Sequence, residues 1–157
     1  MFVKKITFTN YLGIEKTKEC HFQLTKTELG EIAFSMKGGF IANIQRMMDD
    51  LDEPELLKNF KKIIFMSYGE ISPDGDRFMK SEEISRAFSE TPAYDILMQE
   101  LQSNEETFSE FMRNIIPPDL AESLPEKFDS KSLSELLNSS TEAKPIEVIG
   151  NVEGDNT

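Results

Sequence analysis

The stretch TKECHFQLTKTELGEIAFSM, residues 17–36, decides the fold, because its hydrophobic period changes halfway along. In the first half the residues alternate, so Phe22 and Leu24 share one face of a strand. From Thr25 the apolar residues recur at helical spacing. Thr25 and Glu28 also form a capping-box pattern, in which each side chain accepts a hydrogen bond from a backbone amide of the other. We therefore expect a strand that runs directly into a helix.

Two β-hairpins are predicted in the first half of the chain. Residues 3–9 are rich in Val, Ile, Thr and Phe, and residues 10–13 supply a turn, so residues 3–24 form an N-terminal hairpin in this interpretation. A small second hairpin is expected near residues 70–79, around Pro73-Asp74-Gly75-Asp76. Proline fixes φ, glycine accepts positive φ and aspartate bonds nearby backbone, which is typical of a tight turn.

Helical patterns fill most of the remaining chain up to residue 116. Gly38-Gly39 ends the first helix, and Pro54 lies in the first turn of a third, where proline is tolerated. Ser81 and Thr91 are expected N-caps, and Ser103 with Glu106 repeats the capping-box pattern. The expected buried helical residues are Leu29, Ile32, Ala33, Met36, Ile41, Ile44, Met48, Leu51, Leu56, Leu57, Phe60, Ile63, Ile64, Tyr68, Ile84, Ala87, Phe88, Tyr94, Leu97, Met98, Leu101, Phe108, Phe111, Met112 and Ile115. The predicted fold class is α+β, mainly α, with about five to six short helices.

The composition changes after Ile116. From Pro117 onward the chain holds nine acidic residues and three lysines, a net charge of −6. Such a segment buries too little apolar surface to offset its ordering entropy. We therefore expect residues 1–116 to form a compact, mostly helical domain and residues 117–157 a flexible, disordered acidic tail, with one short helix at residues 132–137.

Six apolar residues in this predicted tail are candidates for binding a partner. They could instead dock on a groove of the chain's own domain, or have no specific role. The six residues are Leu120, Leu124, Phe128, Leu133, Leu136 and Leu137.

The overall charge narrows the classes of partner. The chain has 157 residues and a formal net charge of −12. Binding to phosphate groups needs concentrated cations, so this charge argues against a nucleic-acid groove and against an anionic membrane surface. It is compatible with solubility, a cationic partner or DNA mimicry.

Cysteine usage and hydropathy indicate the compartment. Cys20 is the single cysteine, so no intrachain disulfide can form. The N-terminus lacks the apolar region of a signal peptide, and no apolar run approaches the ~20 residues that a membrane helix needs. We therefore expect a cytosolic protein.

Residues suited to covalent catalysis are few. Cys20 and His21 are neighbours, and adjacent side chains of a strand point to opposite faces, so they do not form a Cys–His dyad. We expect Cys20 to be buried and His21 exposed. A zinc site needs three or four Cys or His ligands, more than the chain provides. No catalytic residue, cofactor or metal is therefore assigned.

A calcium loop is the nearest match to a metal motif. If Ser72 is position one, Asp74, Asp76 and Glu83 occupy positions three, five and twelve. Position six requires glycine for the sharp turn but is Arg77. A tight hairpin turn followed by a capped helix explains the same residues.

Two segments resemble a known family. The runs RFMKSEEISRAFSETPAYDILMQEL (77–101) and FSEFMRNIIP (108–117) resemble the tail assembly chaperones of long-tailed bacteriophages. The opening KKITFTNYLGIEKTKECHFQLTKTEL (4–29) is similar to the start of those proteins, a hairpin whose turn contains Tyr-x-Gly, followed by a helix with an acidic first turn. The resemblance covers roughly residues 3–117 and rests on helix caps and aromatic residues.

This resemblance implies a non-enzymatic role without a cofactor. Such chaperones bind the long, helical tape-measure protein and hold it soluble while tail-tube subunits polymerise around it. The implied partners are therefore the tape-measure protein and the tail-tube subunits, and homo-oligomerisation is compatible with the role.

Other classes of function stay open at this point. The chain could be a minor structural protein of the virion, such as a connector or head component, or an acidic inhibitor that mimics DNA. DNA mimicry needs negative charge along one surface, whereas the charge here is divided between residues 1–116 and 117–157, with −6 in each. An enzyme would need a pocket with converging polar groups.

Overall fold

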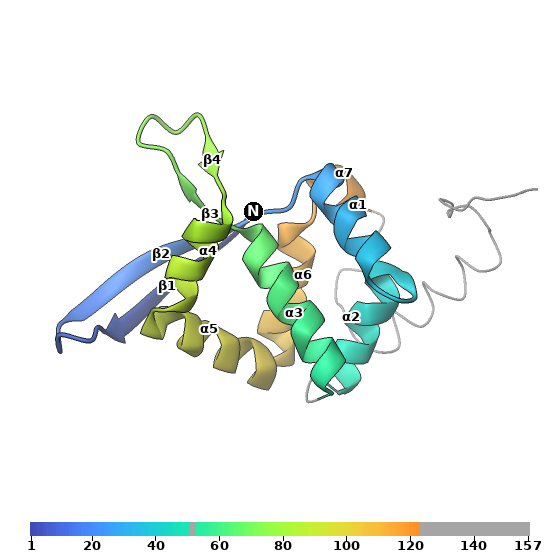
Figure 1. Ribbon diagram of the computed structural model, residues 1–157, viewed down its shortest axis with the longest axis horizontal. Coiled ribbons are helices and arrows are strands. Elements are labelled where there is room, and N and C mark those ends of the chain that lie inside the picture. Colours follow the sequence, from blue (N-terminus) through green and yellow to red (C-terminus); the bar gives the residue numbers. More distant parts are fainter. Residues whose placement is uncertain (51–52, 123–157) are drawn as a thin grey trace, which may run out of the picture.

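The computed structural model describes residues 1–50 and 53–122, and these form helices packed against one small sheet (Figure 1). The strands are β1 (Phe2–Thr9), β2 (Glu15–Phe22), β3 (Tyr68–Ile71) and β4 (Phe78–Met79). The helices of this part are α1 (Lys26–Ser35), α2 (Gly39–Asp49), α3 (Pro54–Ser67), α4 (Glu82–Ser89), α5 (Pro92–Ser103), α6 (Glu105–Ile115) and α7 (Pro118–Ala121). The predicted α+β, mainly α class is confirmed.

Both predicted hairpins are present, and the structure joins them into one antiparallel sheet in the order β1-β2-β3-β4. The junction is the pairing of Phe22 with Tyr68 and of His21 with Gly69. A Cβ atom at Gly69 would lie 2.7 Å from the Phe78 ring, so a side chain has no room there. The sequence did not indicate this junction, because it pairs strands far apart in the chain.

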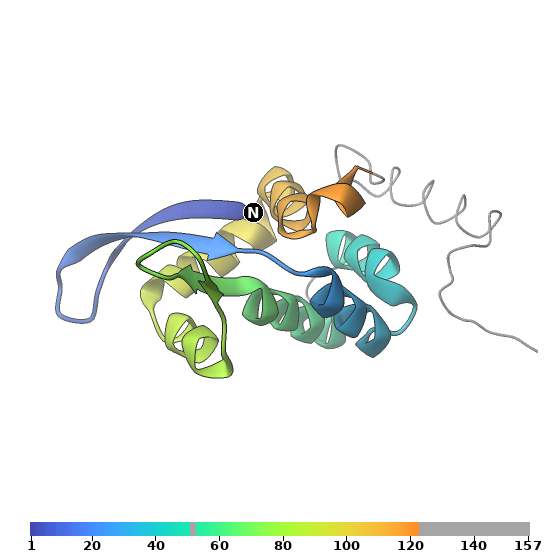
Figure 2. The same cartoon turned by 90° about the horizontal axis from the view of Figure 1, so that it is seen from above.

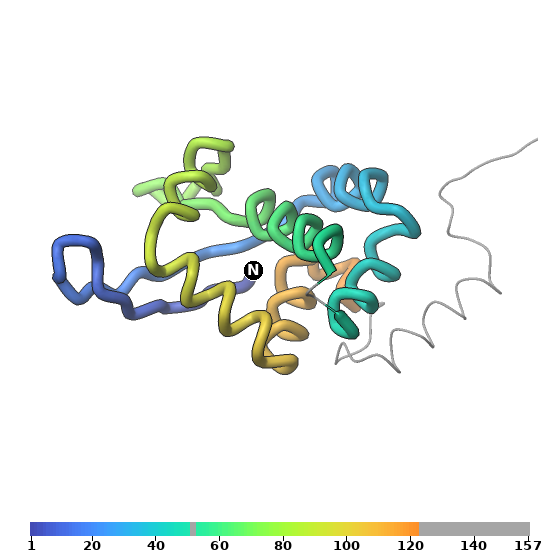
Figure 3. Tube along the Cα trace, turned by 60° about the horizontal axis from the view of Figure 1, so that its bottom comes forward, coloured from blue at the N-terminus to red at the C-terminus, as the bar shows by residue number. Residues whose placement is uncertain are grey.

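While strand β1 packs against α5 and α6, the turn end of the β1–β2 hairpin projects beyond the helices. Figure 2 shows its turn at one end of the molecule and helices α1 and α2 at the other. Helix α3 crosses the centre in Figure 3, with α1 and α2 on one side and α5 on the other. The β3–β4 hairpin forms a second, shorter projection in Figure 1. The fold thus exposes two turns at a distance from its core.

An aromatic cluster connects the sheet to the helices. Phe22 of β2 is fully buried, and its ring lies against aromatic rings from β1, β3, α4 and α6. The rings with centroids 5.4–6.0 Å from that of Phe22 belong to Phe2, Tyr68, Phe88 and Phe111. Because large aromatic side chains dominate core energetics, Phe22 anchors both hairpins.

Most predicted helix starts are confirmed. Thr25 and Glu28 form the capping box at the start of α1, and the Ser81 hydroxyl accepts from the Ile84 amide at α4. The predicted cap at Ser103 is wrong, because α5 continues through that residue. Asn104 has extended backbone and its side chain accepts from the Thr107 amide, so Asn104 is the N-cap of α6.

Several predicted core positions need correction. Ala87 is exposed, whereas Ser85 faces inward and donates a 2.7 Å hydrogen bond to the Phe65 carbonyl. Seven further positions are half-buried against the core: Leu29, Ala33, Ile41, Met48, Leu57, Ile84 and Tyr94. In α2, Met47 is the buried methionine. Tyr68 is buried as predicted, but it is the first residue of β3 rather than part of a helix. Leu51 lies outside the described residues.

The chain continues in a helix beyond Pro117, where the ordered pattern was predicted to end. Pro118 starts α7, since proline is tolerated at the first helical position, and Asp119 forms an ion pair with Lys26 of α1. Residues 123–157, including the predicted helix at 132–137, lie outside the described part. The predicted boundary at residue 116 therefore stays a prediction. Among the described helices, none is long and apolar enough to cross a membrane.

Candidate protein-binding surfaces

The strand that carries Cys20 and His21 separates their side chains. Cys20 is fully buried, and burial raises the pKa of its thiol to about 11. The thiol is therefore protonated near neutral pH and is a poor nucleophile. His21 is half-buried rather than exposed as predicted, and its Nε2 lies 3.2 Å from the Glu19 carboxylate.

The segment that resembles a calcium loop closes on itself. The Asp74 carboxylate accepts hydrogen bonds from the Ser72 hydroxyl at 2.6 Å and from the Asp76 amide at 3.0 Å. These bonds hold the pKa of Asp74 below its ordinary value. Within residues 1–50 and 53–122, no group of three or more His, Cys, Asp or Glu residues could hold a metal ion. The turn uses its polar groups to close the β3–β4 hairpin.

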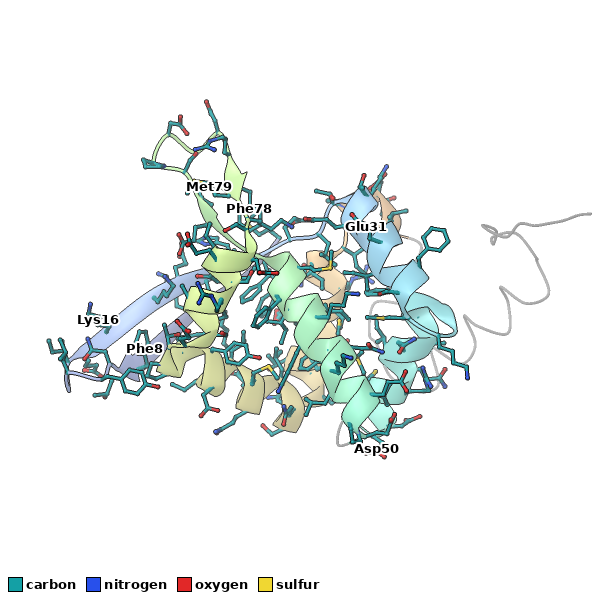
Figure 4. The ribbon with its side chains drawn as sticks, viewed as in Figure 1. Phe8, Lys16, Glu31, Asp50, Phe78 and Met79 are labelled. Carbon is teal, nitrogen blue, oxygen red and sulfur yellow. The ribbon has the colours of Figure 1, made fainter. Side chains whose placement is uncertain are left out.

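The largest apolar exposure on a turn is at the β1–β2 hairpin. Tyr11, Leu12 and Ile14, here called the hairpin tip, are 83%, 84% and 52% exposed. Figure 4 shows the arm that leads to this tip, with Phe8 and Lys16 labelled on its two strands. Singly exposed apolar residues are normal on protein surfaces, but grouped ones mark interaction sites.

A hydrogen-bond network fixes the hairpin tip without using its side chains. The Asn10 carboxamide oxygen accepts from the amides of Leu12 and Ile14, both at 2.9 Å. The Gly13 amide donates to the Asn10 carbonyl at 2.9 Å, and Gly13 has a φ of +81°, which favours glycine. The tip is therefore a preorganised apolar surface, and binding it costs little conformational entropy.

A second surface is a depression of about 480 Å³ beside α3, here called the α3 groove. It is lined by Lys58, Lys61, Lys62, Phe65, Met66, Ser89 and Tyr94. A neighbouring depression of about 350 Å³ shares Phe65 and Met66 and continues toward the start of α4. Residues of α3, the end of α4 and the start of α5 thus line the α3 groove, and Phe65 and Met66 lie between it and the neighbouring depression.

The floor of the α3 groove is aromatic and its rim is cationic. The rings of Phe65 and Tyr94 meet edge to face, with centroids 6.1 Å apart. The rim lysines 58, 61 and 62 are exposed, and none of them forms an ion pair with any part of the chain that the structure describes.

Lys80 in the neighbouring depression differs from these rim lysines. Its ammonium group donates to the carbonyls of Gln23 and Met66 and to the Glu28 carboxylate. Lys80, which follows β4, therefore holds this end of the β3–β4 hairpin against α1 and α3. The rim lysines make no such bonds to the residues that the structure describes.

A third concave surface, of about 670 Å³, lies between the end of α2 and the junction of α5 and α6. Met47 and Met48 line it together with Asp49, Asp50 and Glu105. Methionine is adaptable in packing and is frequent at surfaces that accept varied partners.

The predicted partner-binding residues fall mostly outside the described part. Leu120 lies on α7 and is 38% exposed. The others, Leu124, Phe128, Leu133, Leu136 and Leu137, lie within residues 123–157, so their role stays a prediction. The hairpin tip and the α3 groove were not among the residues predicted from the sequence to bind a partner. The available signals were two large apolar residues inside a predicted turn and three lysines at helical spacing.

Comparison with known proteins places these surfaces in a family context. A family model described as phage tail assembly chaperone matches residues 1–153, which include the hairpin tip and the α3 groove. The comparisons with curated proteins and with solved structures gave no match.

Proposed function

The chain belongs to the phage tail assembly chaperone family, and from this premise we propose that its client is the tape-measure protein. In this proposal the chain binds the tape-measure protein and keeps it soluble until tail-tube subunits polymerise around it. It acts in the cytoplasm of the host, by binding rather than by catalysis.

The observation that carries the proposal beyond the family is the hairpin tip. Tyr11 and Leu12 are more than four-fifths exposed on a turn that closes without their side chains. Exposing such apolar area to water is unfavourable, and no contact within the described residues offsets it. A chaperone that holds an unassembled helical protein needs such a surface, since it must cover apolar residues of its client.

The charge of the chain supports the same role. A net charge of −12 keeps a protein dispersed, and a complex between this chain and an aggregation-prone client would share that charge. We propose that the apolar residues of the acidic segment 117–157, namely Leu120, Leu124, Phe128, Leu133, Leu136 and Leu137, form a further contact with the client.

Co-expression with the tape-measure protein tests the function. The fraction of tape-measure protein in the supernatant after centrifugation is measured with the full chain, with no added protein, and with an unrelated acidic protein of similar charge. We expect the full chain alone to keep the client soluble and to elute with it from a sizing column. A client that is equally soluble in all three cases would contradict the proposal.

A further inference from the structure

We propose that the α3 groove binds an amphipathic helix whose apolar stripe is flanked by acidic residues. The client supplies this helix, and in this respect the inference rests on the proposed function.

The rim of the α3 groove carries positive charge that an acidic partner would complement. Lys58 lies three and four positions before Lys61 and Lys62, so the three ammonium groups share one face of α3. Like charges at this spacing repel one another and disfavour the helix. Within residues 1–50 and 53–122 these lysines form no ion pair, so acidic residues of a partner would relieve their mutual repulsion.

The floor of the α3 groove is apolar and partly exposed to water. Phe65, Met66 and Tyr94 are each half-buried, so each keeps apolar area in contact with water. The edge-to-face contact of Phe65 with Tyr94, and of Tyr94 with Phe88 at 5.6 Å, fixes the aromatic rings. Met66 can adjust to the shape of what it contacts. The floor therefore fits an apolar stripe better than a charged surface.

The length of the groove fits a helix. Residues 58 to 66 span ~12 Å along α3, slightly more than two helical turns. Helices pack at interaxial distances of about 8–10 Å, so a helix laid along α3 would contact both the lysine row and the apolar floor. Charge complementarity then sets the register: acidic residues of the partner face the lysines and its apolar stripe covers Phe65.

Mutation of the rim tests the proposal in the full-length chain. The variant Lys61→Glu/Lys62→Glu reverses two charges in the groove. The control Lys37→Glu/Arg77→Glu reverses two exposed charges outside it, so both variants change the net charge equally. We expect the groove variant to retain about tenfold less tape-measure protein than wild type, because juxtaposed like charges oppose binding, and the control to retain the wild-type amount. Retention by wild type should also fall as salt is added.

Zero-length cross-linking of the wild-type complex provides a second readout that does not depend on folding of a variant. A carbodiimide should join Lys61 or Lys62 to carboxylates of the tape-measure protein. Links only to the chain's own residues 117–157, links only to a second copy in isotope-mixed samples, or retention lost on nuclease treatment would each overturn the assignment.

The two proposals fail in different ways. If wild type retains no tape-measure protein, the proposed function fails and the client assignment of the groove fails with it. If wild type and the groove variant retain equal amounts, the groove assignment fails alone.

Discussion

The two hairpin turns share a backbone design and differ in their exposed side chains. In each, a glycine amide donates to the carbonyl three residues earlier, Gly13 to Asn10 at 2.9 Å and Gly75 to Ser72 at 2.8 Å. Both glycines have a φ of +81°. In each turn an Asn or Asp side chain also accepts a backbone amide, at Asn10 in one and at Asp74 in the other.

The two turns differ in the residues at their centres. Pro73 and Asp74 are residues that a turn favours for its own closure. The side chains of Tyr11 and Leu12 contribute nothing to closure, because the Asn10 side chain and backbone amides make the bonds. Under the proposed function, the β3–β4 turn stabilises the fold while the hairpin tip binds the client. The β3–β4 turn is therefore a natural control for the tip.

The largest effect is expected at the anchor that both hairpins share. Phe22→Ala removes a fully buried ring that contacts four other aromatic rings, so the free energy of unfolding should fall by about 3–5 kcal/mol. Urea denaturation followed by circular dichroism measures this change. A loss below about 1 kcal/mol would mean that the hairpins do not depend on this cluster.

Replacing the tip should separate binding from stability. For Tyr11→Ser/Leu12→Ser we expect the affinity for the tape-measure protein to fall by about 2 kcal/mol or more, because apolar anchors dominate binding energy. The free energy of unfolding should change by less than about 0.5 kcal/mol, as for other exposed substitutions. The control Pro73→Ser/Asp76→Ser alters the other turn, and the same loss of affinity in this control would remove the distinction between the two turns.

Replacing the paired glycines should affect the two turns alike. Gly13→Ala and Gly75→Ala each force a side chain into the left-handed region, which costs about 1–2 kcal/mol of folding free energy. Thermal denaturation should show similar losses for both variants. Client binding should weaken for Gly13→Ala alone, and equal weakening by both would argue against a role specific to the tip.

Lowering the pH should weaken the hydrogen bonds that close the β3–β4 turn and leave those at Asn10 in the β1–β2 turn unchanged. The hydrogen bonds from Ser72 and Asp76 lower the pKa of Asp74 below its ordinary value of 3.8. The stabilisation is therefore present above that value and is lost as the pH falls through the lower pKa of the folded state. Asn10 does not titrate.

Backbone amide NMR shifts between about pH 6 and about pH 2 measure this difference. The Asp76 amide should shift and the Leu12 amide should not. Asp74→Asn should abolish the shift at Asp76, and its persistence in that variant would assign it to another carboxylate.

The fold was predictable where the determinants are local. The change of period at Leu24 and Thr25 and the caps at Thr25 and Ser81 depend on residues within one turn of each other. The pairing of Phe22 with Tyr68 was not predictable, since a strand pattern does not identify its distant neighbour. The inward position of Ser85 could not be predicted either, because the carbonyl that accepts a hydrogen bond from its hydroxyl belongs to Phe65 in another helix.

The two candidate binding surfaces were harder to predict from the sequence than the fold. Tyr11 and Leu12 lie in a predicted turn, and the turn signal does not report exposed apolar side chains. The α3 groove combines Lys61 with Tyr94 and residues of α4, so it exists only after the helices pack. Its cationic rim also makes DNA mimicry less favourable for the described residues, because a mimic needs continuous negative charge.

Hydroxyl-radical footprinting of the wild-type chain, with and without the tape-measure protein, tests the central claim most directly. If the hairpin tip is the contact, labelling of the Tyr11 and Leu12 side chains falls several-fold in the complex while labelling of Pro73 and Arg77 stays constant. Unchanged labelling at the tip, in a sample where the client is shown to be bound, would contradict the account.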